Sequence, residues 1–197
     1  MVSELVLTES FLGYKFEIFN DRPAIDLVHA VQVHGSLILE DNKIEEDKTE
    51  ADGILSLNLS TPIAIKTADC LPIVVIGYNG VANLHAGWRG VHQKISQSSE
   101  LEKIEPKFFY IGPHIQASDF EVQSDFRENF PASSHFEEID GKLTFNLAAE
   151  VSDQIKQSWP EAQIQISSLS TFGNPKFNSF RENGTKQRNW NVLSIED

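Results

Sequence analysis

The sequence contains a single cysteine, Cys70, and no apolar run approaching the ~18 residues that a membrane-spanning helix needs. One cysteine excludes an intramolecular disulfide, so a reducing compartment is the default expectation. The N-terminus also lacks a basic start, a long apolar stretch and a small-residue cleavage site, so no export signal is predicted. These absences together predict a cytoplasmic protein with no membrane segment.

Basic side chains are also scarce, with 16 Lys and Arg against 29 Asp and Glu and a formal net charge of −13. Such a surface repels phosphate backbones, and no basic stripe interrupts it, which excludes nucleic acid as an expected partner. One local exception lies near the C-terminus, where Lys176, Arg181, Lys186 and Arg188 follow closely on one another. Elsewhere the negative charge is best explained by solubility.

The length of 197 residues and the 40% hydrophobic content, with thirteen Phe, are sufficient for a packed core. No internal repeat and no long Pro/Gly/Ser linker divides the chain, so we expect one domain over residues 1–197. The stretch Glu40–Asp52 is charged and nearly devoid of apolar residues. It predicts an exposed loop that ends in the turn residues Ala51-Asp52-Gly53.

Strand-like apolar runs dominate the rest of the chain. They are Pro62–Lys66, Leu71–Gly77, Val81–Leu84, Lys107–Ile111, Ala162–Ser167 and Trp190–Ile195. Asn79-Gly80 joins the second run to the third and predicts a hairpin. Because the predicted strands outnumber the helices and are mostly connected by hairpins, the pattern favours an α/β layered fold with a mixed sheet.

Three helices are predicted from capping residues and apolar spacing. The first covers Val91–Lys103, after the glycine of GWRG. The second is capped by Asp119 and buries Val122, Phe126 and Phe130; the third is capped by Asn146 and buries Leu147, Val151, Ile155 and Trp159.

Three short motifs carry residues that bind metals: QVHG with His34, TADC with Cys70, and HAGWRG with His85. Each ligand is expected at the end of a strand, which is rigid yet open to solvent and suits a metal with a vacant position. Three protein ligands and one exchangeable water are typical of catalytic zinc. The spacing fits no compact ligand motif, and a lone Cys is often a small buried hydrophobe, so residue types alone leave structural roles open.

The pair TADC and HAGWRG, with QVHG upstream, resembles the laccase-domain family, also called the YfiH-type multicopper polyphenol oxidase family. Its members are described as zinc-containing purine nucleoside phosphorylases. The resemblance runs from about Ala30 to the end of the chain. Further agreements are Ala51-Asp52-Gly53, Ile111-Gly112-Pro113, Phe120-Glu121-Val122, and Ser179-Phe180-Arg181 with the following Gly184-Thr185 and Arg188.

This resemblance implies that His34, Cys70 and His85 bind zinc within a layered α/β sandwich. It implies phosphorolysis of adenosine, inosine and methylthioadenosine, with adenosine deamination as a second activity, so the expected partners are a nucleoside and phosphate. Two departures concern substrate contacts. The chain reaches QVHG without the longer family segment that holds an SLNLG-type stretch and an Asn-Arg pair, and Glu182 stands where the family has a second arginine.

The candidate phosphate- or substrate-binding residues are Arg89, Arg181 and Arg188, and Cys70 and Arg89 are the candidate catalytic residues. Arg89 lies at a predicted loop-to-helix junction, which suits a phosphate oxyanion, although pairing with Asp69 is an equal alternative. Arg181 and Arg188 are interpreted as part of an anion-binding site, and the alternative is that they lie in a solvated loop.

Two further residues lie next to these motifs. Asp69 either orients a metal ligand or terminates a strand. His114 is a candidate fourth ligand in the segment Gly112-Pro113-His114. No role is assigned to His29, His92 or His135.

Three other functions compete with phosphorolysis. A copper-dependent polyphenol oxidase would use the same imidazole and thiolate ligands, but a multicopper site needs more histidines than the six in this chain. A cysteine hydrolase would use Cys70 as nucleophile and His85 as base. A non-catalytic, zinc-stabilised binding protein would account for the departures in the substrate-binding segments. Neither the oligomeric state nor the preferred nucleoside is indicated.

Overall fold

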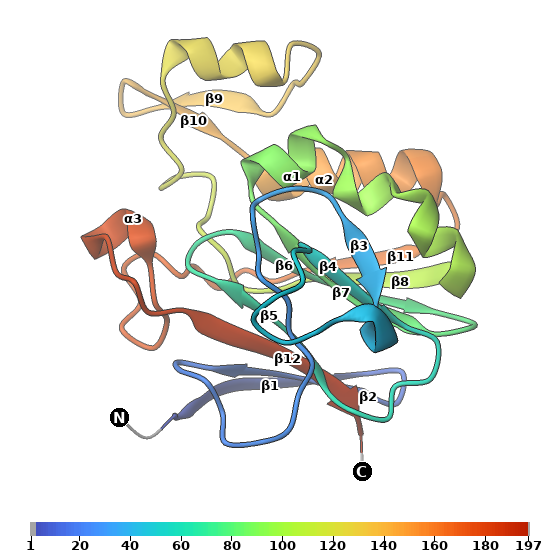
Figure 1. The fold of residues 1–197 in the computed structure, drawn as a ribbon. Helices are drawn as coiled ribbons and strands as arrows, with labels where there is room; N and C mark the ends of the chain where they lie inside the picture. Colours follow the sequence, from blue (N-terminus) through green and yellow to red (C-terminus); the bar gives the residue numbers. More distant parts are fainter. Residues whose placement is uncertain (1–2, 197) are drawn as a thin grey trace.

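The computed structural model describes residues 3–196, which form three layers (Figure 1). A six-stranded sheet in the order β11-β8-β6-β7-β4-β3 lies in the middle. A four-stranded sheet, β1-β2-β12-β5, covers one face, and α1 and α2 cover the other. The β11–β8 and β3–β4 pairs are parallel and the other pairs of the central sheet are antiparallel. The predicted layered α/β sandwich with a mixed sheet is therefore confirmed.

The strands are β1 (Leu5–Phe11), β2 (Tyr14–Phe19), β3 (Ile38–Glu40), β4 (Gly53–Ser56), β5 (Ile63–Thr67), β6 (Leu71–Gly77), β7 (Val81–Ala86), β8 (Pro106–Ile111), β9 (Phe136–Ile139), β10 (Lys142–Phe145), β11 (Gln163–Ile166) and β12 (Asn189–Ile195). The α-helices are α1 (Trp88–His92), α2 (Leu147–Ser158) and α3 (Phe180–Asn183). The 3₁₀ helices are η1 (Asp41–Lys43), η2 (Ile95–Gln97), η3 (Ser99–Ile104) and η4 (Ser124–Asn129). No helix within residues 3–196 is long and apolar enough to cross a membrane.

The central strand β6 is buried on both faces, which explains its uninterrupted apolar sequence. Leu71, Ile73 and Val75 pack with the helices, whereas Val74 and Ile76 pack into the core between the two sheets. Burying one such aliphatic side chain contributes roughly 1.5–3 kcal/mol. The strand that follows Cys70 is therefore firmly anchored in the middle of the molecule.

All six strands expected from apolar runs are present, with end points that differ by at most two residues. The hairpin at Asn79-Gly80 is confirmed by the antiparallel pairing of β6 with β7. The cap of α2 is also as predicted, because the side chain of Asn146 accepts a hydrogen bond from the backbone N–H of Ala149 at 3.0 Å.

The predicted helix Val91–Lys103 is wrong. The structure has the short α1 followed by the 3₁₀ helices η2 and η3. Lys94 has a φ of 61°, which interrupts the helix, and Glu105 ends the segment with a φ of 51°. The weak apolar face of this stretch offers too little burial to hold a longer helix against these breaks.

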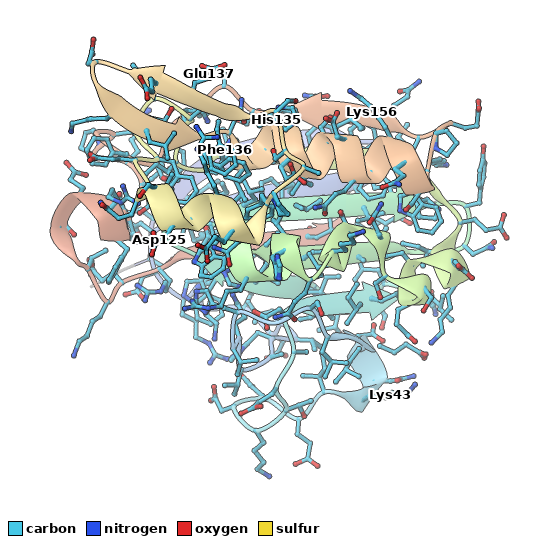
Figure 2. All side chains as sticks on the ribbon, turned by 90° about the horizontal axis from the view of Figure 1, so that it is seen from above. Lys43, Asp125, His135, Phe136, Glu137 and Lys156 are labelled. Atoms are coloured by element: carbon cyan, nitrogen blue, oxygen red, sulfur yellow. The ribbon has the colours of Figure 1, made fainter. Side chains whose placement is uncertain are left out.

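The helix predicted to begin at Asp119 is also wrong, because only η4 forms in this region. Phe130 is buried as expected and Phe126 is half-buried, but both lie in an aromatic cluster with Phe145, at centroid distances of 4.8 and 5.5 Å from its ring. Phe136 lies between the β9–β10 hairpin and η4 and contacts the same cluster (Figure 2). Tertiary packing of the rings therefore replaces the helix.

The strands β1 to β4, β9 and β10 were not expected from the sequence. The loop prediction for Glu40–Asp52 holds for the exposed Glu45–Lys48 turn, but Asp52 has no exposed surface. A fully buried carboxylate needs several hydrogen-bond partners, and those partners lie in the site described next.

Candidate metal site and adjoining pocket

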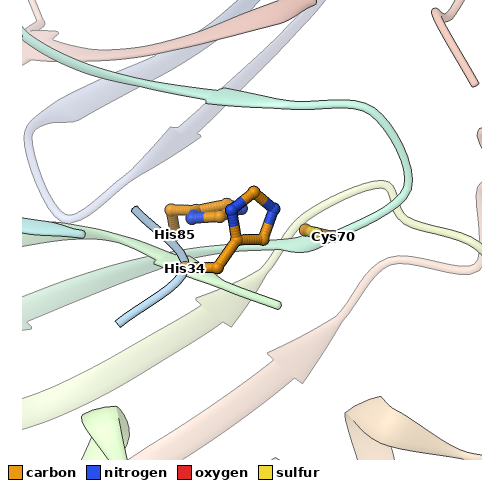
Figure 3. Close-up of side chains that lie close together, drawn as sticks. All are labelled: His34, Cys70 and His85. Atoms are coloured by element: carbon orange, nitrogen blue, oxygen red, sulfur yellow. The ribbon is translucent and has the colours of Figure 1, made fainter. Parts of the chain in front are cut away.

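Strand pairing brings Cys70 and His85 together. In the antiparallel β6–β7 pair Leu71 lies opposite Ala86, so the residue before β6 and the penultimate residue of β7 meet at one end of the sheet. His34 reaches the same point from the loop before β3. The donor atoms of His34, Cys70 and His85 all lie within 4.8 Å of one another (Figure 3).

The backbone at these ligands differs from the prediction that all three lie at strand ends. Only His85 does so. Cys70 lies in the turn between β5 and β6, after Asp69 with a φ of 91°, and His34 lies in an irregular loop with a φ of 59°. Left-handed backbone at residues other than glycine is strained and persists only where surrounding contacts impose it.

At His34 those contacts come from the buried carboxylate of Asp52. Its Oδ2 atom accepts hydrogen bonds from the backbone N–H groups of Gly35 at 2.7 Å and Val33 at 3.2 Å. Its Oδ1 atom accepts the backbone N–H of His34 at 3.0 Å and the Nδ1–H of His85 at 2.8 Å. One side chain therefore sets both the loop of the first ligand and the ring of the third, a role that metal sites commonly give to carboxylates.

This role of Asp52 was not predicted, because Ala51-Asp52-Gly53 was expected only to form a turn. Orientation of a ligand, one of the two roles expected for Asp69, lies with Asp52 instead. Asp69 accepts the Thr171 hydroxyl at 2.7 Å and the backbone N–H of Arg181 at 2.7 Å. It ties the TADC turn to the C-terminal segments and, within residues 3–196, makes no hydrogen bond to a candidate ligand.

Charges in the cluster favour the metal-binding form of the thiol. Burial alone would raise the pKa of Cys70, but hydrogen bonds with His34 and His85 outweigh it and lower the pKa to about 6. For His85 the effects have the opposite sign: burial alone would lower its pKa, but hydrogen bonds to Asp52 and Cys70 outweigh burial and raise the pKa to about 9. Cys70 is thus mainly a thiolate at neutral pH, the form that binds metals.

The glycines of HAGWRG provide room for the donors. A Cβ atom at Gly87 would lie 3.2 Å from both the Cys70 Sγ and the His34 Cδ2. A Cβ atom at Gly90 would lie 2.8 Å from the backbone oxygen of Gly35. Gly90 therefore lets α1 pack against the His34 loop, and Gly87 leaves space for the side chains of Cys70 and His34. Two imidazoles with one thiolate suit zinc or copper. The donor set and its surroundings therefore fit a metal ion.

We expect Gly87→Ala to lower metal affinity by about tenfold or more, because the added methyl group must push Cys70 or His34 out of place by a few tenths of an ångström. Competition with a chromophoric chelator measures this affinity. The melting temperature of the chelated variant should match that of the chelated parent, which separates a site effect from a folding defect. An unchanged affinity would contradict the close contact at Gly87.

The three candidate ligands line a pocket of about 620 Å³, a volume that accommodates a small molecule. Lys66, Phe180 and Arg188 line it as well, together with the carboxylate residue Asp47. Phe180 is 59% exposed, although it is a large apolar residue. The pocket thus combines metal donors, cationic groups and an accessible aromatic ring.

Of the three predicted anion-binding arginines, only Arg188 is among the described residues that line this pocket. The exposed Arg89 stacks its guanidinium over the Trp88 ring at 4.5 Å. Arg181 donates to the backbone oxygens of Asp119 at 3.5 Å and Glu121 at 2.9 Å. No ion pair between Arg89 and Asp69 is found in the described part of the chain.

His114, the candidate fourth ligand, does not join the donor cluster. It is buried, and its Nδ1 atom lies 2.7 Å from the backbone oxygen of Gly112. Burial lowers its pKa, so it is a neutral structural histidine. His29 lies near Glu46 and Asp47, in a group of potential metal ligands separate from the His34–Cys70–His85 cluster. In that group the Arg22 guanidinium already pairs with Glu46.

The fold and the site together define a three-layered α/β protein with a candidate His₂Cys metal centre open to a pocket. Residues 17–196 match the model of the family described as multi-copper polyphenol oxidoreductase laccase. The chain belongs to this family, as the resemblance of its three motifs predicted.

Two curated relatives are named purine nucleoside phosphorylases, an activity that differs from the oxidoreductase in the family description. The chain is 26% identical over 178 residues to a purine nucleoside phosphorylase of Aquifex aeolicus, a match that covers 88% of this chain and 84% of that protein. It is 36% identical over 106 residues to the purine nucleoside phosphorylase YfiH of Shigella flexneri, which covers 51% of this chain and 44% of that protein. A crystal structure of a Neisseria meningitidis protein superposes with a TM-score of 0.84 at 21% identity, covering 97% of this chain and 99% of the other. At this low identity the structural similarity shows a shared fold and nothing about activity.

Proposed function

We propose that the protein is a zinc-dependent purine nucleoside phosphorylase that acts on adenosine, inosine or methylthioadenosine. The observation that carries the proposal is that His34, Cys70 and His85 open onto the same pocket as Phe180 and Arg188. The names of the Aquifex and Shigella relatives support the same activity.

Zinc is the proposed metal because two imidazoles and one thiolate leave a fourth position open, as in catalytic zinc sites. When bound, zinc would supply a Lewis acid and a bound water of lowered pKa. Copper binds the same ligands, but the six histidines of the chain are too few for the multinuclear site of a polyphenol oxidase.

The surrounding residues have separate tasks in this proposal. The exposed ring of Phe180 offers a face on which a purine can stack. The guanidinium of Arg188 presents planar hydrogen-bond donors to phosphate and holds it beside the ribose. Positioning of the two substrates in one pocket accounts for much of the acceleration expected of such an enzyme. Adenosine deamination is proposed as a second activity of the same site.

Product analysis with a nucleoside panel tests the proposal directly. The zinc-loaded protein is incubated with adenosine, inosine and methylthioadenosine, with and without phosphate, and the products are identified by mass. We expect free purine base and ribose 1-phosphate or its methylthio analogue, formed only when phosphate is present and lost after chelation. Deamination would appear as inosine formed from adenosine without phosphate. If no nucleoside yields a base in the presence of phosphate, the proposed activity is wrong.

Phe180→Ala should raise the KM for the nucleoside by about tenfold and leave zinc content unchanged, because stacking of a base on an aromatic ring contributes about 1–3 kcal/mol. The matched control is Tyr78→Ala, which removes another exposed ring outside the pocket. Steady-state kinetics on both variants measure the difference. An equal KM in the two variants would exclude stacking on Phe180.

A cysteine hydrolase is the second candidate, and a specific contact supports it. Asp52, His85 and Cys70 form a carboxylate–imidazole–thiolate series, in which the imidazole bonds to both neighbours. His34 distinguishes the two functions, because a hydrolase of this kind does not require it. His34→Ala should abolish phosphorolysis and zinc binding, whereas a hydrolase would retain its activity in that variant.

A further inference from the structure

The lysine that lines the candidate active-site pocket, Lys66, was not singled out by its sequence position. It lies on β5, the edge strand of the four-stranded sheet, opposite Trp190 of β12. Its ammonium group lies 5.2 Å from the centroid of the Trp190 ring. This stacking holds the long side chain along the pocket wall.

The backbone at Lys66 is coupled to the metal-site loop through Gln32 of the QVHG motif. The Gln32 side chain accepts the backbone N–H of Lys66 at 2.6 Å and donates to its backbone oxygen at 2.7 Å. Gln32 lies two residues before His34. The two hydrogen bonds therefore hold the lysine and the metal donors in a defined relative position.

The charge around Lys66 is unusual for an acidic protein. Arg188 lines the same pocket, and the carboxylate of Asp47 is the acidic group there. Glu46, which lies close by, is already paired with Arg22 and His29. Within residues 3–196 the Lys66 ammonium forms no hydrogen bond or ion pair, and burial lowers its pKa. A half-buried cation without an ion-pair partner is incompletely compensated for its lost hydration, which favours the entry of an anion.

We propose that Lys66 and Arg188 together form the oxyanion-binding subsite of the pocket and hold the phosphate group beside the His34–Cys70–His85 cluster. This inference rests on the proposed function, which requires phosphate, and assigns that substrate to a place in the pocket. Lys66 lies on β5 and Arg188 immediately before β12, and neither is paired with a carboxylate in the described structure. The Nη1 atom of Arg188 donates to the backbone oxygens of Thr185 at 2.9 Å and Gln187 at 2.7 Å, which leaves its Nε and Nη2 donors for charge-assisted hydrogen bonds to an anion. Arg89 and Arg181, the other sequence candidates, are not among the described residues that line the pocket.

Phosphate binding to the zinc-loaded protein, measured by calorimetry at constant ionic strength, tests the assignment without turnover. Lys66→Met and Arg188→Met should each weaken phosphate binding by at least about tenfold, since a hydrogen bond to a charged group contributes one to two decades in affinity. Lys66→Arg should retain most of the affinity. Zinc content should be unchanged in every variant.

The matched control is Lys107→Met. Lys107 is also half-buried and stacks its ammonium over an aromatic ring, that of Tyr78 at 4.9 Å, but it lies outside the pocket. This variant should bind phosphate as the parent does. Equal phosphate affinity in Lys66→Met and the parent, or no phosphate binding by the parent, overturns the assignment.

The two proposals fail in different ways. If phosphate binds in a manner that depends on Lys66 but no nucleoside is cleaved, the subsite stands and the phosphorylase activity does not. If nucleosides are cleaved with the same phosphate KM in Lys66→Met and the parent, the activity stands and the subsite does not.

Discussion

Zinc content should fall from about one ion per chain to almost none in His34→Ala, Cys70→Ala and His85→Ala, and phosphorolysis should fall with it. Each variant removes one of three donors that lie within 4.8 Å of one another. Losing a residue that merely orients a ligand costs up to about a hundredfold in affinity or activity, so losing a ligand should cost more. Cys70→Ala should have the largest effect, since thiolate is the strongest of these ligands.

Elemental analysis after expression in zinc-replete cells measures this loss. His92→Ala is a suitable control because His92 is an exposed histidine outside the donor cluster, and it should keep its zinc. Alkylation offers a second measurement. Iodoacetamide should label Cys70 slowly in the zinc-loaded protein and quickly after chelation. Full zinc in Cys70→Ala, or equal labelling rates, would show that the thiolate is not a ligand.

Asp52→Asn should destabilise the protein by about 3–5 kcal/mol, the usual cost of removing one partner of a buried charged pair. Each carboxylate oxygen of Asp52 accepts two N–H groups. Whichever way an asparagine amide is turned, its NH₂ group would face two donors instead of accepting from them. Metal affinity should fall by about 10- to 100-fold as His34 and His85 lose their orientation.

Urea denaturation and chelator competition measure these two effects separately. Asp69→Asn is the matched control, because Asp69 is also a buried carboxylate with two donors, and asparagine tolerates its positive φ of 91°. It should lose stability but retain metal affinity, since it bonds to the C-terminal segments. Metal affinity unchanged in Asp52→Asn would contradict the organising role of Asp52.

The contrast between strands and helices shows how far local pattern reaches in this chain. Leu71–Gly77 was predicted correctly because a central strand buries both faces and leaves a continuous apolar run. The helix predicted from the spacing of Phe126 and Phe130 was wrong, because the same spacing also suits an aromatic cluster with Phe145. Periodicity reports which side chains are buried and does not identify what they pack against.

The motifs QVHG, TADC and HAGWRG determined by themselves which side chains are candidate metal donors and to which family the chain belongs. Residue chemistry was sufficient there, because few side chains bind zinc and the chain has only one thiol. Whether these donors bind a metal stays a prediction for the zinc measurements above.

Only the tertiary structure decided which other residues reach the donors. The β6–β7 register places Cys70 beside His85, and the buried Asp52 bonds to a histidine 33 positions away. The β5–β12 register likewise places Lys66 against Trp190 and in the pocket with Arg188. A shift of one residue in either register would turn these side chains to the opposite face of the sheet. Such long-range pairings depend on the whole core, so no local stretch of sequence reveals them.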